Sequence, residues 1–504
     1  MNRKNILCVL LLVLMACSPA YSAQTFREQL ANLEGVVSID EVVQSVDVFA
    51  EKYIAWFEQP LDWASPDIGK FLQRVEICFQ DYDRVNVVNV DGYALSTSYI
   101  NFDDRHELAR MYNANYINVE YRYFDKSIPE GLSEDKTALW EYLTDENASY
   151  DFHNIIEQLR GILSGTWVFT GASKGGQAAN VFSYYFPNDA DAYVAYVAPF
   201  CDGTNDPRLM EAVYTTIGTE RYGEAQAKIY RDMVLEFQVE AVRNRDYVQP
   251  LIVSADTKPR WFGNASKDFE AEIIDYAVGV WQYDQEFASI DQVLKMPRQD
   301  NPDTQINERT EYLNALAKLI KDSNPPSDVS IFPYYYQAAT ENGHYRLKTQ
   351  YLREALASEG LSMYMTEADE IDREERTRFT EEQYRLFTFD PYMRNELLAW
   401  SHTTQSNVIM IYGNSDPWYF VRLPDVDDNP NVHIFTTTMS HVASIMRMPE
   451  GQRAQVTALL NEWLMADAVL PSGGGSSSGG SCNAGMFSGY GLLYAVIVLK
   501  AKRR

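Results

Sequence analysis

One serine lies in a setting that can make a hydroxyl nucleophilic. Ser173 is the centre of a Gly-Ala-Ser-Lys-Gly motif at 171–175, directly after an apolar run at 167–170 and before a helical pattern at 177–186. Glycines on both sides relieve crowding in a tight strand-to-helix turn, which is the nucleophile elbow of hydrolases. The same spacing recurs at 475–479, but there no strand or helix flanks the serine. The sequence therefore predicts Ser173 as a catalytic nucleophile.

A serine hydroxyl needs a base, and the base needs an acid that orients it. In hydrolases with this elbow the chain order is Ser, then Asp, then His. Asp416 follows the strand pattern at 408–412 in a turn that Pro417 stiffens, and His441 follows the strand pattern at 432–436 in a loop of small residues. The sequence predicts Asp416 and His441 as the other two members of a triad.

An oxyanion needs two N–H donors. We expect one from the backbone of Lys174 and the second from the backbone of Tyr93, because Gly92 lets that loop approach closely. The Lys174 side chain is expected to do no more than lie solvated at the surface. The sequence has no His-x-x-x-His pair and no Cys cluster, so we expect no metal and no cofactor.

Strand and helix patterns alternate in two stretches of the chain. The expected strands are 71–79, 85–90, 116–119, 167–170, 193–200, 408–412 and 432–436, and the expected helices between them are 103–113, 148–163, 177–186 and 453–465. This alternation predicts an α/β fold with a mostly parallel sheet, the α/β-hydrolase fold. Residues 24–201 and 400–470 would form its two parts. The acidic, tyrosine-rich helical stretch at 202–399 is too long for a loop and predicts an inserted helical cap.

Both ends of the chain have the character of targeting segments. Residues 1–23 combine Arg3 and Lys4 with an apolar run and small residues, as signal peptides do. A lipoprotein signal ending at Cys17 is the alternative. Residues 471–482 form a Gly/Ser linker, and 483–504 are apolar and then basic. This tail resembles the C-terminal sorting (CTERM) tails of exported bacterial proteins; the alternative is an ordinary membrane anchor. Either form predicts an exported protein held at the membrane, at least transiently.

The composition excludes some functions. The 504 residues carry 43 Lys and Arg against 71 Asp and Glu, a net charge of −28, so nucleic acid is a poor partner for this chain. An aromatic content of 13% excludes a mostly disordered protein. Cys78 and Cys201, the two cysteines of the body, fall on well-separated strands and are expected to be buried thiols. The oligomeric state is not indicated.

The motif at 171–176, followed by Tyr-Val-Ala-Pro at 196–199, resembles the secreted bacterial tripeptidyl aminopeptidases, the prolyl tri/tetrapeptidyl aminopeptidase family of serine peptidases. The likeness covers about residues 65–460 and includes 413–418. It implies an α/β-hydrolase fold with a helical cap, a Ser-Asp-His triad and release of tri- or tetrapeptides from free N-termini, with a preference for proline as one expectation. Segments 120–124 and 337–343 also resemble the Pro-X carboxypeptidase and dipeptidyl-peptidase family.

A peptide's free N-terminus is a cation and favours a buried carboxylate. Glu341 and Glu120 are the candidates, and Gln337 and Trp418 are further candidate substrate contacts. For Glu120 a structural ion pair, with Arg122 as its partner, is the alternative. Two other functions remain open at this stage. One is a Pro-X carboxypeptidase, dipeptidyl peptidase or esterase on the same scaffold, and the other is a catalytically silent surface protein whose acidic cap binds a partner.

Overall fold

The computed structural model describes residues 24–44, 48–95, 106–132, 137–253, 264–283, 287–299, 307–323, 332–370 and 387–470. The predicted signal peptide and the predicted C-terminal tail lie outside these ranges. Within them, no helix has both the length and the apolar composition that a membrane crossing requires.

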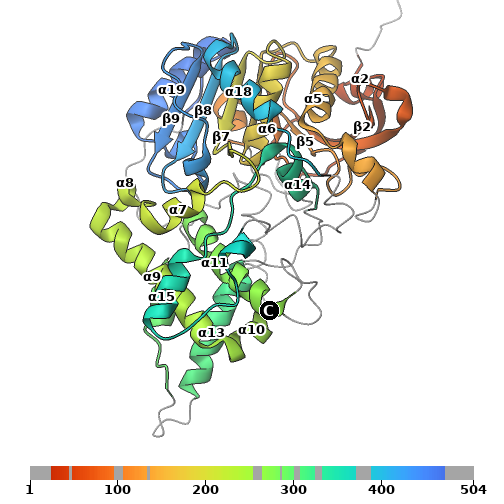
Figure 1. Ribbon diagram of the computed structural model, residues 1–504. Helices are drawn as coiled ribbons and strands as arrows, with labels where there is room; N and C mark the ends of the chain where they lie inside the picture. Colours follow the sequence, from red (N-terminus) through yellow and green to blue (C-terminus); the bar gives the residue numbers. More distant parts are fainter. Residues whose placement is uncertain are drawn as a thin grey trace, which may run out of the picture.

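A nine-stranded sheet forms the centre of the fold (Figure 1). Its spatial order is β1-β2-β3-β5-β4-β6-β7-β8-β9. Strands β1 to β3 and the β3–β5 pair are antiparallel, whereas every neighbouring pair from β5 through β4 to β9 is parallel. The strands are β1 (Val36–Glu41), β2 (Glu51–Pro60), β3 (Lys70–Phe79), β4 (Asn86–Val90), β5 (Asn115–Val119), β6 (Trp167–Ala172), β7 (Ala192–Tyr196), β8 (Val408–Gly413) and β9 (Val432–Thr437).

All seven predicted strands are present, and the sheet is mostly parallel as expected. The prediction for β7 was too long, because Val197 takes a positive φ of 43° and the chain leaves the sheet there. Strands β1 and β2 were missed. The pattern of β2 is hidden by polar side chains that face inward, such as Lys52, which forms a buried ion pair with Glu76 at 2.8 Å.

Helices cover both faces of the sheet. Side chains of α2 (Phe26–Ala31), α5 (Asp145–Arg160), α6 (Lys174–Tyr185) and α18 (Tyr392–Thr403) pack with one face, and those of α4 (Glu107–Tyr112) and α19 (Glu450–Leu464) pack with the other. Neighbouring strand residues alternate between these two cores, as Phe169 and Val168 do in β6. Parallel strands buried on both faces explain the near-continuous apolar runs of the sequence.

Most of the helices between β7 and β8 form a separate core, which lies beyond the end of the sheet at which β7 stops (Figure 1). Trp281 is fully buried in that core. The helices of this cap are α7 (Arg208–Thr215), α8 (Thr219–Tyr222), α9 (Glu224–Arg243), α10 (Arg245–Ile252), α11 (Ala265–Tyr283), α12 (Phe287–Leu294), α13 (Glu308–Ser323) and α15 (Gln350–Ser358). Shorter helical turns are η1 (Pro66–Ile68), η2 (Thr137–Tyr142), η4 (Glu367–Glu370), η5 (Pro417–Val421) and η6 (Ile445–Arg447).

The predicted cap boundaries need a correction. Helix α14 (Phe332–Gln337), its continuation η3 (Ala338–Asn342) and helix α18 lie within the predicted cap range. Their side chains nevertheless pack into the core of the sheet, as Tyr336 and Trp400 do. The boundary expected at residue 400 falls inside α18, so the hydrolase core resumes before it. The two cysteines agree with the prediction: Cys78 in β3 and Cys201 after β7 are buried thiols.

Candidate active site

Ser173 occupies a strained turn between β6 and α6. The strand ends at Ala172 and the helix begins at Lys174, which leaves Ser173 alone at φ 56° and ψ −123°. A non-glycine residue in this region is unfavourable and persists only when its surroundings hold it. The Ser173 N–H donates to the carbonyl of Tyr196 at 2.9 Å. The turn therefore has the nucleophile-elbow geometry that the sequence predicts.

The loop after β4 lies against the first turn of α6. A Cβ at Gly175 would lie 1.9 Å from the Val90 carbonyl oxygen, and a Cβ at Gly92 would lie 2.7 Å from the Gly175 nitrogen. Only glycines permit this approach, and Gly92 also has a positive φ of 78°. The loop that carries Tyr93 therefore lies beside Lys174, as an oxyanion site built from these two backbone N–H groups requires.

Asp416 and His441 form a buried hydrogen-bonded pair. Asp416 follows β8 and caps η5, with Oδ1 accepting the Trp418 N–H at 3.1 Å. Its Oδ2 lies 2.6 Å from His441 Nδ1. The two residues are 1% and 3% exposed. Burial raises the pKa of the Asp416 carboxyl, and the neighbouring His441 opposes that rise. A carboxylate on Nδ1 fixes the imidazole tautomer and leaves Nε2 as the basic nitrogen.

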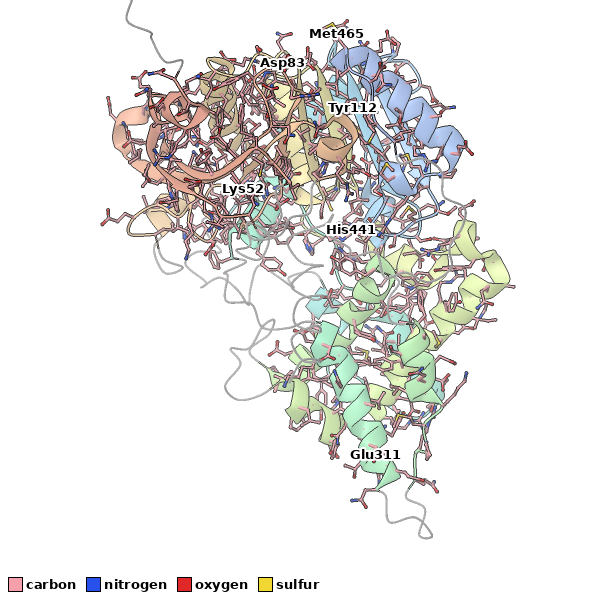
Figure 2. The ribbon with its side chains drawn as sticks, turned by 180° about the vertical axis from the view of Figure 1, so that it is seen from behind. Lys52, Asp83, Tyr112, Glu311, His441 and Met465 are labelled. Atoms are coloured by element: carbon pink, nitrogen blue, oxygen red, sulfur yellow. The ribbon has the colours of Figure 1, made fainter. Side chains whose placement is uncertain are left out.

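The loop that carries His441 is held from two sides. On the sheet side, a Cβ at Gly413 would lie 2.3 Å from the Met439 and Ser440 carbonyl oxygens, so glycine is needed where the loop passes β8. On the cap side, the His441 N–H donates to the carbonyl of Gln282, at the end of α11, at 3.0 Å. His441 accordingly lies at the border between the sheet and the cap (Figure 2).

One tyrosine lies beside Ser173 and another beside His441. The Tyr93 side chain is hydrogen-bonded to Ser173 and interacts electrostatically with Tyr283. The Tyr283 ring meets the His441 ring edge-on, with 6.1 Å between centroids. Burial raises the pKa of both phenols, so they stay protonated at neutral pH. The contact through Tyr283 was not predicted, because its sequence position in the cap gives no sign of proximity to a loop after β9.

Aromatic rings continue from Tyr93 to the Asp416 turn. The Tyr334 ring lies 5.7 Å from that of Tyr93 and 5.9 Å from that of His344. The His344 ring in turn lies 5.6 Å from that of Trp418. The structure therefore places Trp418, a predicted substrate contact, in an aromatic wall beside Asp416. Flat apolar rings of this kind suit a proline side chain.

Glu120 does not face the site, so its prediction as a substrate contact is wrong. Its carboxylate is fully buried and paired with Arg74 at 2.5 Å, and it also accepts from the Ser127 hydroxyl at 2.7 Å and the Leu95 N–H at 2.8 Å. The expected partner was also wrong, because Arg122 pairs with Asp151 instead.

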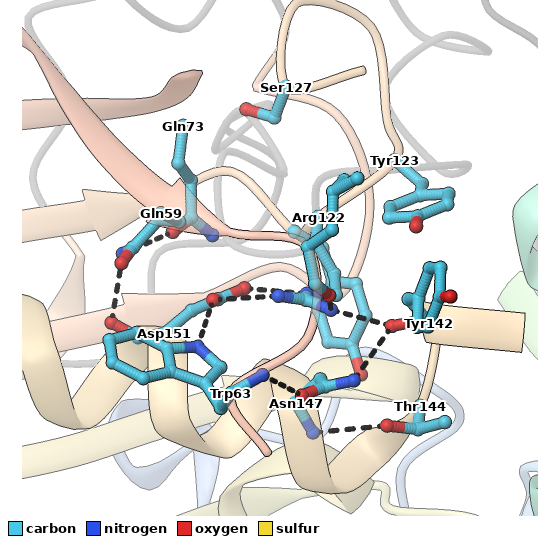
Figure 3. Close-up of polar contacts among 12 residues, drawn as sticks. Gln59, Trp63, Gln73, Arg122, Tyr123, Ser127, Tyr142, Thr144, Asn147 and Asp151 are labelled. Atoms are coloured by element: carbon cyan, nitrogen blue, oxygen red, sulfur yellow. Dashed lines mark hydrogen bonds and ion pairs between the residues drawn. The ribbon is translucent and has the colours of Figure 1, made fainter. Parts of the chain in front are cut away.

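The ion pair between Arg122 and Asp151 is bidentate (Figure 3). Its two hydrogen bonds measure 2.7 and 2.9 Å, and both side chains are fully buried. Arg122 also donates to backbone carbonyls of Pro60 and Leu61 at the end of β2. The pair therefore connects α5 to the end of β2, a strand that the sequence analysis missed.

Glu341 and Gln337 lie together near the start of α5. Glu341 is half-buried, and its Oε2 accepts the N–H of Asp145 at 2.9 Å. Gln337 is fully buried and donates to Asp145 Oδ1 at 2.9 Å. The Glu341 carboxyl is thus only partly buried, and its role as a substrate contact stays a prediction. Gln337 is fully buried against Asp145, which does not fit the direct substrate contact that the sequence predicts for it.

The Lys174 side chain is not solvated, contrary to expectation. It is 3% exposed, and its Nζ lies 3.2 Å from the centre of the Tyr121 ring. Burial lowers the pKa of Lys174 to about 7, although Asp145 and Glu341 act in the opposite direction. The sequence carries only weak signals that Lys174, Asp145 and Glu341 lie near one another. Lys174 stands between small residues in the elbow, and the Thr-Asp-Glu start of α5 indicates a helix cap rather than a cluster of charges.

Among the described residues, one group has side-chain atoms close enough to hold a cation: His153, Glu157 and Asp189. His153 Nδ1 already lies 2.6 Å from Asp189, and Arg160 pairs with Glu157 at 2.5 Å. These contacts make the group a surface ion-pair cluster.

The strained serine, the imidazole–carboxylate pair and the parallel sheet define a serine hydrolase of the α/β-hydrolase fold. The chain belongs to the peptidase S37 family: the sequence profile described as PS-10 peptidase S37 matches residues 21–473. It is therefore a serine peptidase.

Individual proteins are also similar to the chain. The chain is 25% identical over 417 residues to a prolyl tri/tetrapeptidyl aminopeptidase of Streptomyces mobaraensis, covering 81% of this chain and 79% of that one. It is 30% identical over 153 residues to a probable serine protease of Arabidopsis thaliana, covering 26% and 30%. Among solved structures, a peroxisomal α/β-hydrolase of Saccharomyces cerevisiae aligns with 90% of this chain and 97% of its own at TM-score 0.34 and 11% identity. A proline iminopeptidase of Mycobacterium smegmatis aligns with 81% and 99% at TM-score 0.31 and 12% identity.

Proposed function

We propose that this serine peptidase is an exported exopeptidase that releases tri- and tetrapeptides from free N-termini, with Ser173, His441 and Asp416 as its triad. The observation that carries the proposal is the buried His441–Asp416 pair, which follows β8 and β9, together with the strained turn of Ser173 after β6.

In this mechanism the Ser173 hydroxyl attacks the scissile carbonyl while His441 Nε2 takes its proton. Asp416 holds the imidazole in the required tautomer and stabilises the imidazolium that forms. The backbone N–H groups of Lys174 and Tyr93 donate to the oxyanion. His441 then gives its proton to the departing amine, and water hydrolyses the acyl-enzyme by the same steps.

Glu341 supports action at a free N-terminus. Its half-buried carboxylate lies at the start of α5, where a ligand's ammonium group can reach it. The aromatic wall of Tyr93, Tyr334, His344 and Trp418 offers flat surfaces for a proline ring. The likeness to a prolyl tri/tetrapeptidyl aminopeptidase supports the same substrate class.

A substrate pair tests the mode of action. We expect release of a fluorogenic group from Ala-Ala-Pro substrates with a free amino terminus, and at least a tenfold loss of kcat/KM when that terminus is acetylated. Ser173→Ala should abolish both reactions and serves as the control. Equal turnover of free and acetylated substrates would contradict N-terminal recognition, and preferential cleavage of single residues from a C-terminus would favour the carboxypeptidase alternative.

Export and membrane attachment complete the proposal. They rest on the signal-like segment 1–23 and the linker, apolar and basic segments of 471–504. N-terminal sequencing of the protein from its native cell envelope should begin at Gln24. A lipid-modified Cys17 would support the lipoprotein alternative, and an intact Met1 in the cytoplasmic fraction would contradict export.

A further inference from the structure

The loop between β9 and α19 carries His441, and different elements anchor its two halves. Before His441 the loop lies against the end of β8. After His441, the Ile445 N–H donates to Glu107 Oε1 at 2.9 Å, and the Met446 N–H donates to Glu107 Oε2 at 3.0 Å. The second anchor is therefore a side chain of α4, to which the proposed mechanism gives no role.

Glu107 is the first residue of α4, and it is 1% exposed. Its helix neighbours Leu108 and Met111 pack in the same apolar core as Ile445. A carboxylate in such a place is costly unless its oxygens accept hydrogen bonds. Burial raises the pKa of Glu107, and the hydrogen bonds of its carboxylate oppose that rise. The two N–H groups of the His441 loop thus offset the cost of burying this side chain.

Two adjacent N–H groups at the start of a helical turn suit a carboxylate in particular. Ile445 and Met446 begin η6, and the first N–H groups of a helical turn have no partner within the turn. Each oxygen of Glu107 accepts one of these N–H groups. A glutamine offers a single oxygen and would turn its own NH₂ group toward the other donor. It would leave a buried N–H without an acceptor, and the loop would have to move to satisfy it.

The same carboxylate faces the residue that holds the nucleophile turn. Burial raises the pKa of the Tyr196 phenol at the end of β7, and the charge of Glu107 adds to that rise. The Tyr196 carbonyl accepts the Ser173 N–H at 2.9 Å. The ring of His106, directly before Glu107, meets the Tyr196 ring edge-on, with 6.1 Å between centroids. Glu107 therefore contacts the loop that carries the base and also faces the strand end that holds the serine turn.

We propose that Glu107 is a positioning residue of the peptidase reaction, which holds the segment after His441 where the imidazole reaches Ser173. Glu107 acts through the backbone of Ile445 and Met446 and touches no reacting atom. This inference rests on the proposed triad and adds a fourth side chain on which the triad depends. A misplacement of about 1 Å can cost about a hundredfold in rate, so loss of this anchor should be visible in the kinetics.

Fluorophosphonate labelling of the full-length protein measures the effect without a peptide substrate. Glu107→Gln should lower the rate constant for labelling of Ser173 about 10- to 100-fold. On the free Ala-Ala-Pro substrate the loss should fall on kcat, with KM changed less than about twofold, because the substrate contacts are untouched. Glu107→Asp keeps the charge but is shorter by one methylene, so its loss should lie between those of the original protein and Glu107→Gln.

The decisive comparison is made in the His441→Ala protein. The base is absent there, so adding Glu107→Gln should change the residual rate of Ser173 labelling by less than about twofold. An equal loss with and without His441 would mean that the substitution damages the serine turn or the fold in general, and would overturn the positioning role. Glu107→Asp is measured in the same two proteins, so that the comparison stands even if Glu107→Gln does not fold.

Glu270→Gln is the matched structural control. Glu270 is fully buried in the cap, where its carboxylate accepts the adjacent N–H groups of Tyr364 at 2.9 Å and Met365 at 2.7 Å. It lies about 18 Å along α11 from the end that contacts the His441 loop. Glu270→Gln should lower the thermal stability but keep the labelling rate within about twofold. A loss of labelling as large as that in Glu107→Gln would overturn the inference.

These measurements separate failure of the inference from failure of the proposed function. If His441→Ala labels as fast as the original protein, the triad itself is refuted. If His441→Ala is slow but Glu107→Gln slows labelling less than about tenfold, the positioning role of Glu107 alone is refuted.

Discussion

The Asp416–His441 pair and the Lys174–Asp145–Glu341 group lie near the same serine, yet they are built in different ways. Each member of the pair follows the end of a strand in a turn of its own, so the chain order and local sequence identify both. The lysine group draws on α5, α6 and η3, and no local pattern connects these segments. Catalytic residues that follow the ends of strands can be predicted from the sequence. Clusters of charged side chains that come from several helices cannot.

The largest expected effect concerns the first of these regions. Asp416→Asn should lower kcat/KM about 10³- to 10⁴-fold, because the amide favours the wrong tautomer of His441. Steady-state kinetics on the free Ala-Ala-Pro substrate measures it, with circular dichroism to verify folding. Activity within tenfold of the original protein would mean that Asp416 does not orient the base.

Two glutamates, one fully buried and one half-buried, are expected to differ in their contribution to stability. Glu120→Gln removes one of the two carboxylate partners of the buried Arg74, which keeps Asp125 at 2.9 Å, and should cost about 1.5–3 kcal/mol of unfolding free energy. Urea denaturation measures the loss.

Glu341→Gln is the matched control for Glu120→Gln, because the same chemical change is made at a half-buried carboxyl. It should change the free energy of unfolding by less than about 1 kcal/mol. Equal losses in the two variants would indicate that Glu341 is a structural group like Glu120.

A smaller effect is expected in the aromatic wall. Trp418→Ala removes a ring beside His344 and should raise KM for a proline-containing substrate about tenfold more than for its all-alanine counterpart. The ratio of the two KM values is the measurement. An equal change for both substrates would mean that the ring is not part of a proline pocket.

The smallest effect is a pH dependence of stability that arises from Lys174. Its pKa is lowered to about 7 in the folded protein, so the unfolded chain binds more protons between about pH 7 and 10. The stability of the original protein should therefore rise relative to Lys174→Met as the pH increases through that window, by up to about 1.4 kcal/mol per pH unit. Thermal unfolding of both proteins from pH 6 to 9.5 tests the sign of this pH dependence. A difference in stability between the two proteins that stays constant with pH would show that the pKa of Lys174 is not lowered by burial.

The sequence predicted the parallel half of the sheet well because strands buried on both faces give continuous apolar runs. It failed at β2, where the inward-facing Lys52 interrupts the pattern, and at β1, which has no fully buried residue. It also misplaced the end of the cap, because α18 follows the cap helices in the chain but packs against α6.

The residues of the candidate site also differ in whether the sequence could predict their positions. Ser173, Asp416 and His441 could be proposed from their turns. The burial of Lys174 and the pairing of Glu120 with Arg74 depend on contacts between distant elements, about which their own neighbours in sequence carry no information.

The central claim is that the His441–Asp416 pair activates Ser173. Covalent labelling tests this claim most directly. A fluorophosphonate probe should add once to the folded protein, on the proteolytic peptide that contains Ser173. The labelling rate should fall at least a thousandfold in His441→Ala. An adduct on another residue, or an unchanged rate in His441→Ala, would contradict the account.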